Sequence, residues 1–215
     1  MNTTNRKIHF IIQTPLKMLN RLRHFLQTVN LKSVSSVASS VKKNHIEMML
    51  IKPRKLKLII ACRANITRSA YLHGYFEKCL KEYYPHARKK IQIESAGIEA
   101  RRGSSAHEVV QHVAKLNGFS LKDHRSDPFK RSAIKRATAI LVMEKWQKER
   151  LIEQFPFAQE KIYLLMEYLW QGDPLEIRDV PDPTGKNTED YKDFIDLAHA
   201  ETERILHELA RQNLL

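Results

Sequence analysis

The stretch that decides the fold is Leu56-Lys57-Leu58-Ile59-Ile60-Ala61-Cys62-Arg63-Ala64-Asn65-Ile66-Thr67-Arg68-Ser69. Its first six residues are mostly apolar and partly β-branched, which is typical of a strand buried in a parallel sheet. From Ser69 to Tyr84, apolar side chains recur at helical spacing. The stretch therefore predicts a strand, a short loop and a helix, with Cys62 where the strand ends and Arg68 where the helix begins.

The rest of the body alternates in the same way. Alternation of strands and helices indicates a parallel sheet that is covered on both faces. We expect an α/β fold of three αβα layers around a four-stranded parallel sheet, occupying residues 55–215. The further strands are expected at residues 91–95, 138–143 and 162–165, and the helices at 69–84, 105–117, 144–154 and 188–212.

Composition and cysteine content narrow the class of protein. With 215 residues, 42% of them hydrophobic, the chain can form one globular domain with a substantial core. No apolar run approaches the roughly 18 residues that a membrane span requires. The only two cysteines are Cys62 and Cys79, so we expect a reducing, cytoplasmic compartment rather than a secreted disulfide scaffold. Cys79 falls within a predicted helix and is interpreted as a small core residue.

Charge separates an N-terminal extension, residues 1–54, from the body. Residues 1–46 hold eight Lys or Arg and no acid, which is +8 of the net +13. Residues 15–31 have the spacing of a basic amphipathic helix, and residues 33–40 resemble a linker. Four interpretations stay open: a poorly ordered tail, a helix that contacts a membrane surface or a partner, a targeting segment, or translation starting at Met48 or Met49.

The loop after the first strand combines three features that bind an anion. Ligands of open parallel sheets bind at the carboxyl ends of the strands. The start of a helix offers free N–H groups and the positive end of the helix dipole. A thiolate at Cys62 is stabilised there, Arg68 can bind two phosphate oxygens, and Ser69 can donate a hydrogen bond to the sulfur. The loop therefore predicts phosphate removal through a cysteinyl-phosphate intermediate.

This loop resembles that of the low-molecular-weight protein tyrosine phosphatases, whose pattern is Cys-x-Gly-Asn-x-Cys-Arg-Ser-Pro. The resemblance covers residues 54–212. It extends to Ser95-Ala96-Gly97, Asp123-His124-Arg125-Ser126, Leu141-Val142-Met143 and Val180-Pro181-Asp182-Pro183. It implies that the backbone of residues 62–69 binds the phosphate, and that Asn65, Ser95 and His124 hold the loop in shape.

The leaving oxygen needs a proton, and a carboxylic acid close to the loop can supply it. Three Asp-Pro pairs compete, at Asp127, Asp173 and Asp182, and composition does not choose between them. The family resemblance selects Asp182, because its acid is an Asp-Pro shortly before the last helix.

The sequence departs from the family pattern at several loop and rim positions. Ala64 replaces the loop glycine, which is acceptable if the φ angle there is negative. Thr67 replaces the cysteine that can protect the nucleophile by a disulfide. Thr184 and Gly185 replace aromatic rim residues. The remaining differences are Ala70 for proline, Ile66 where arginine phosphatases tend to carry Thr, and the basic rim candidates Arg63, Arg101 and Arg102.

We therefore expect a protein tyrosine phosphatase with Cys62 as nucleophile, Arg68 as phosphate clamp and Asp182 as acid and base. Arg63 and Arg101, if they face the substrate rather than solvent, favour acidic phosphopeptides or other polyanionic phosphoesters. The alternatives are another anionic phosphoester, phosphoarginine, or a phospho-binding module without catalysis. No nucleotide-binding or metal-ligand motif is present, so we expect neither cofactor, metal nor nucleic-acid partner.

Overall fold

A computed structural model of the chain describes residues 55–215. The predicted amphipathic helix at 15–31 and the linker at 33–40 lie outside the described residues, and the domain boundary near residue 54 stays a prediction. Within the described part, no helix is long and apolar enough to cross a membrane.

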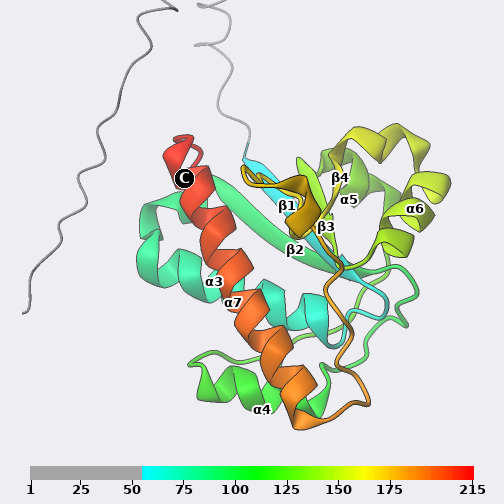
Figure 1. Ribbon diagram of the computed structural model, residues 1–215, viewed down its shortest axis with the longest axis vertical. Helices are drawn as coiled ribbons and strands as arrows, with labels where there is room; N and C mark the ends of the chain where they lie inside the picture. The colour runs from blue at the N-terminus through cyan, green and yellow to red at the C-terminus, as the bar shows by residue number, and fades with distance from the viewer. Residues whose placement is uncertain (1–54) are drawn as a thin grey trace, which may run out of the picture. The chain divides into compact units, whose positions relative to one another are not determined.

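Four parallel strands form one sheet with the order β2-β1-β3-β4 (Figure 1). The chain passes from β1 to its neighbour β2 and then crosses to the other side of β1 to form β3. This reversal places a topological switch point at the carboxyl end of β1, where ligands bind in open α/β sheets. The strands are β1 (Leu56–Cys62), β2 (Ile91–Gly97), β3 (Ala139–Val142) and β4 (Ile162–Leu164).

Helices cover both faces of the sheet, which confirms the predicted three-layer α/β fold. In Figure 1, α3 and α7 lie on one face, and α5 and α6 lie toward the β4 edge on the other. The predicted helices are found with end shifts of up to three residues, and α5 was not predicted. The helices are α3 (Arg68–Tyr83), α4 (Glu108–Leu116), α5 (Arg131–Arg136), α6 (Lys145–Gln154) and α7 (Thr188–Arg211), with 3₁₀ turns η1 (Pro85–Lys89), η2 (Pro156–Lys161) and η3 (Pro174–Glu176).

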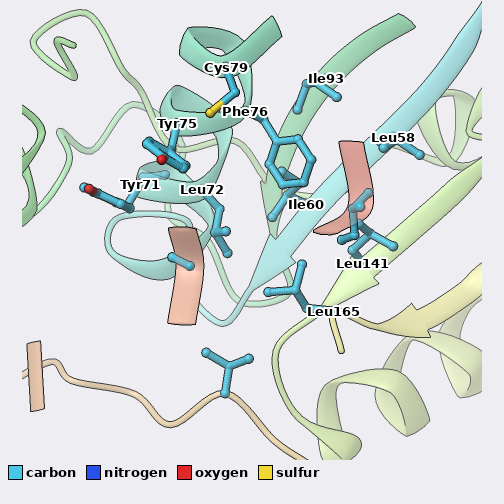
Figure 2. Packing of buried hydrophobic residues seen from close by; sticks show 14 of the residues in the cluster. Leu58, Ile60, Tyr71, Leu72, Tyr75, Phe76, Cys79, Ile93, Leu141 and Leu165 are labelled. Carbon is cyan, nitrogen blue, oxygen red and sulfur yellow. The ribbon is translucent and has the colours of Figure 1, made fainter. Parts of the chain in front are cut away.

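Alternate residues of β1 enter two separate apolar clusters. Leu58 and Ile60 pack with α3 and α7, and Figure 2 shows Ile60 beside Phe76 of α3. Ile59 packs on the opposite face with residues from α5 and α6. Because side chains of a strand point alternately to its two faces, β1 is buried on both sides. Its carboxyl end is thereby fixed in position, and the Cys62 loop begins there.

Candidate active site

Residues 62–69 curl over the first turn of α3, with Cys62 at the end of β1 and only 3% exposed. The backbone N–H of Asn65 donates to Sγ of Cys62 over 3.3 Å, and Oγ of Ser69 lies 3.0 Å from the same sulfur. Nδ2 of Asn65 donates to that hydroxyl oxygen, which leaves the Ser69 hydrogen free for the sulfur. Two donors therefore stabilise a thiolate at this position.

The first turn of α3 contributes no negative charge of its own. It holds no acidic residue, and Thr67 at the N-cap of the helix makes no side-chain capping bond. By contrast, α4 begins with Glu108, and α7 has Glu189 and Asp190 in its first turn. Acidic residues at a helix start stabilise the helix by opposing its dipole. Their absence from α3 leaves the positive end available to an anionic ligand.

Asn65 holds the loop by its conformation and by its contacts. Its φ angle is 56°, a left-handed value that Asn tolerates better than most residues. Its carbonyl oxygen accepts a hydrogen bond from Nε2 of His124 over 2.8 Å, so that ring nitrogen carries a proton. Its Oδ1 accepts from the backbone N–H of Asp127. Ala64, next to it, does not share the positive φ, which meets the condition for replacing the family glycine.

One side of the loop lies against the segment that follows β2. The backbone N–H groups of Ile98 and Glu99 donate to the carbonyl oxygens of Cys62 and Arg63 over 3.0 and 2.8 Å. A Cβ placed on Gly97 would lie 2.9 Å from the Arg63 carbonyl oxygen. This approach is closer than real Cβ contacts allow, so a glycine is required where the two segments meet.

Arg68 is buried, with a side chain 2% exposed, and its guanidinium joins three segments of the chain. Nη1 donates to Glu144 just after β3 and to the carbonyl oxygen of Val180, over 2.8 and 2.7 Å. Nη2 donates to Oδ2 of Asp182 over 2.7 Å. Its Nε is buried without a partner. Buried polar groups normally have partners, so this orphan donor fits a group whose ligand is an oxyanion.

Among the three competing aspartates, only Asp182 contacts Arg68 in the described part of the chain. The carboxylate of Asp127 pairs with Arg102 and Lys130 instead. Asp173 caps the turn η3 through its Oδ1 and is exposed. The geometry therefore favours Asp182 as the carboxyl group that serves the loop.

The opposite side of the loop contacts the segment after Asp182 and the start of α4. The Thr184 hydroxyl donates to Oγ1 of Thr67 over 3.1 Å, and the backbone N–H of His107 donates to the carbonyl oxygen of Ile66 over 2.8 Å. The Tyr191 hydroxyl lies 3.5 Å from Nδ1 of His107. Burial, and then the nearby Asp182 charge, raise the pKa of Tyr191, which keeps its hydroxyl neutral.

The predicted basic rim is partly neutralised. Nε of Arg63 lies 2.9 Å from the Glu99 carboxylate in an exposed ion pair, and Arg102 pairs with Asp127. The Arg101 side chain is exposed and forms no ion pair with a described residue. Of the two arginines assigned to the rim, the charge of Arg63 is therefore partly compensated by Glu99, and that of Arg101 is not compensated by any described residue.

The predicted role of Ser95 in holding the Cys62 loop in shape requires a correction. Its hydroxyl lies 3.3 Å from Nδ1 of His73 and forms no hydrogen bond with residues 62–69. The reason is register, since Ser95 pairs with Ile60, two residues before the loop begins. His73 comes from α3, and burial followed by the adjacent His124 lowers its pKa to about 4.

Glu144, His73, His107 and Tyr191 were not predicted. Glu144 carried a usable signal, because it follows a predicted strand and parallel strands end at the same edge of the sheet. His107 and Tyr191 carried none, since both reach the site only through the packing of α4 beside the start of α7. Cys79 is buried, as expected, and lies eleven residues beyond Arg68 along α3, about 16 Å at 1.5 Å per residue.

An open parallel sheet with an anion-binding loop at its switch point, an arginine and a thiol defines a phosphomonoester hydrolase of α/β type. The family model for low molecular weight phosphotyrosine protein phosphatases matches residues 57–214. The chain belongs to this family.

The relatives of this chain are named for two different substrates, phosphotyrosine and phosphoarginine. It is 32% identical over 126 residues to the protein-tyrosine-phosphatase Ptp of Acinetobacter johnsonii, covering 59% of this chain and 78% of the relative. It is 28% identical over 156 residues to a protein-arginine-phosphatase of Geobacillus stearothermophilus, covering 73% and 95%. The solved structure of the YwlE arginine phosphatase from that organism matches with a TM-score of 0.64 at 27% identity, over 74% of this chain and 96% of that one.

Proposed function

We propose that this phosphatase removes phosphate from phosphotyrosine in proteins, with Cys62 as nucleophile and Asp182 as general acid and base. One observation carries the proposal: the guanidinium of Arg68 binds the Asp182 carboxylate over 2.7 Å. Arg68 directly precedes Ser69, whose hydroxyl lies beside the Cys62 sulfur. These contacts link the thiol, the phosphate-binding arginine and a carboxyl group in one site.

In the first step, Sγ of Cys62 attacks phosphorus and the bond to the leaving oxygen breaks, while Asp182 gives that oxygen its proton. Backbone N–H groups of the loop and Arg68 bind the three remaining oxygens. Arg68 then presents its free Nε and releases Nη2 from Asp182, so that both donors face the phosphate. The product is a cysteinyl phosphate and a free phenol.

In the second step, water attacks phosphorus and transfers a proton to Asp182. The S–P bond breaks and the electron pair returns to sulfur. The Ser69 hydroxyl, which has its hydrogen free for the sulfur, stabilises the departing thiolate. Inorganic phosphate leaves, and the protonated Asp182 is ready for the next cycle.

Phosphoarginine is the second candidate, because an arginine phosphatase matches this chain over 95% of its own length. Ile66, a half-buried residue of the Cys62 loop, favours phosphotyrosine, since arginine phosphatases tend to carry Thr at this position. An apolar side chain suits an aromatic ring better than a charged guanidinium.

A substrate panel tests the proposal, with phosphotyrosine, phosphoserine, phosphoarginine and phosphoinositide compared at equal concentration. We expect the highest kcat/KM on phosphotyrosine and no turnover by Cys62→Ser. A higher value on phosphoarginine would transfer the assignment to that substrate. If the wild type hydrolyses none of these compounds, nor a chromogenic aryl phosphate, the chain is a binding module.

A second experiment tests whether the rim arginines contribute to substrate choice, by comparing kcat/KM on acidic and neutral phosphotyrosine peptides. We expect Arg101→Gln to lower kcat/KM on acidic peptides selectively, and Arg63→Gln to have a smaller effect because Glu99 already compensates Arg63. Equal rates on both peptides, unchanged in both variants, would show that the two arginines do not contribute to substrate choice.

A further inference from the structure

An apolar groove of about 320 Å³ lies between α4 and the start of α7, outside the residues that bind phosphate. Figure 1 shows these two elements side by side, α4 in green and the start of α7 in orange. Half of its lining residues are apolar or aromatic, and the others are two lysines and two polar residues. The lining consists of Val109, Val113, Tyr191, Ile195, Lys186, Lys192, Asn187 and Thr188.

Tyr191 connects the groove to the residues that surround the Cys62 loop. This side chain lines the groove, and its ring stacks on His107, with centroids 6.1 Å apart. His107 in turn donates its backbone N–H to Ile66 of the Cys62 loop. A substrate segment whose phosphorylated residue enters that loop can therefore reach the groove with a neighbouring side chain.

No side chain rises from the backbone between the entrance of the Cys62 loop and the groove, because the residue there is Gly185. Thr184 borders the mouth through its bond to Thr67, and Lys186 lines the groove. Gly185 lies between them at a φ angle of 78°, and a Cβ there would have no atom within 4 Å. No side chain at Gly185 therefore separates the mouth from the groove.

The surface of the groove selects an apolar occupant. Val109 on α4 is 38% exposed although it is a large hydrophobic residue. The ammonium groups of Lys186 and Lys192 pair with Asp190 and Glu189 at 3.6 and 3.4 Å, so their charges are compensated at the rim. Their alkyl stems are left to contact an apolar side chain.

The geometry points to a substrate subsite: the groove binds one apolar side chain of the phosphorylated protein, close in sequence to the phosphorylated residue. This inference rests on the proposed function and adds to it the part of the substrate that is recognised. A mouth bordered by Thr184 and Gly185 offers no aromatic wall there, so a neighbouring residue supplies binding that the phosphotyrosine ring does not receive.

The test uses phosphotyrosine peptides that differ only by Leu or Ala at each position flanking the phosphotyrosine, with the full-length chain. We expect Leu at one of these positions to raise kcat/KM about tenfold, equivalent to about 1.4 kcal/mol. Val109→Asp and Val109→Trp, which charge or fill the groove, should reduce this preference to less than about twofold. The rate on an aryl phosphate, which has no flanking residue, should stay unchanged in both.

Leu116 provides the matched control. It is 74% exposed, lies two turns further along α4 and does not line the groove, so Leu116→Asp and Leu116→Trp should leave the preference intact. A wild type that hydrolyses aryl phosphate but treats Leu and Ala peptides alike would overturn the subsite and leave the proposed function standing. A concentration-dependent dimer in sedimentation that Val109→Asp abolishes, with no peptide preference, would overturn it in favour of a second copy as occupant.

Discussion

Asn65 combines a left-handed backbone with hydrogen bonds that reach Ser69, His124 and Asp127. Replacement by Ala keeps a Cβ at positive φ and removes both side-chain bonds. We expect Asn65→Ala to lower the free energy of unfolding by about 1–3 kcal/mol and kcat/KM on aryl phosphate by more than tenfold. Thermal unfolding and steady-state kinetics measure the two effects.

Asn65→Gly separates the two causes, because glycine accepts the positive φ while also lacking the side chain. Its stability should lie between those of the wild type and Asn65→Ala, with activity as low as in the Ala variant. If both variants were as active as the wild type, the amide would have no part in holding the loop.

Replacing Asp182 should lower the catalytic rate without weakening the affinity for phosphate. Asp182→Ala removes the proton donor, so kcat on phenyl phosphate should fall by about 10²- to 10⁴-fold. The same change frees Nη2 of Arg68, so inorganic phosphate should inhibit at the same or a lower concentration. Weaker phosphate binding in this variant would show that the carboxylate positions Arg68 rather than competing for it.

At the scale of elements, one hydrogen bond between Thr67 and Thr184 connects the Cys62 loop to the segment that carries Asp182. Thr67→Val and Thr184→Val each remove one partner and keep the shape. We expect a double-mutant cycle to give a coupling of about 0.5–1.5 kcal/mol in kcat/KM. Strictly additive single effects would show that this hydrogen bond does not set the position of the acid.

The same scale shows which parts of the fold were predictable. The apolar run of β1 and the helical spacing after Ser69 predicted both elements because these signals are local. Helix α5 was missed because it has six residues and buries only Ile134, too few to show a period. Tyr191 reaches the loop only through His107, which is far away in sequence, and a pairing of that kind leaves no trace in a local pattern, whereas the position of Glu144 after a predicted strand was a usable signal.

At the scale of the whole molecule, His73 makes the free energy of unfolding depend on pH. Its pKa is lowered to about 4 from 6.5, first by burial and then by His124, so the folded state holds it neutral. Between these two values the unfolded chain binds more protons, so stability is complete above pH 6.5 and falls as the pH drops toward 4. The loss attributable to His73 is on the order of 3 kcal/mol at most.

Urea unfolding of wild type and His73→Gln at several pH values between 4 and 7 measures this contribution. The variant should lose less stability on acidification than the wild type. Parallel curves would assign the acid sensitivity to other groups, among them Glu94 and His124, which face His73.

Cys62 lies six residues before α3 begins and Cys79 lies four residues before it ends, and this separation affects how the enzyme responds to peroxide over time. A disulfide needs Cα atoms within about 7 Å, and Cys79 lies about 16 Å beyond Arg68 along the helix. Because Thr67 stands where the family has its second loop cysteine, no cysteine of the chain is near enough to form a disulfide with an oxidised Cys62. We therefore expect an oxidised Cys62 to depend on an external thiol while it is still a sulfenic acid, and sustained peroxide to drive it on to the irreversible sulfinic and sulfonic acids, so that the active fraction falls with the cumulative dose.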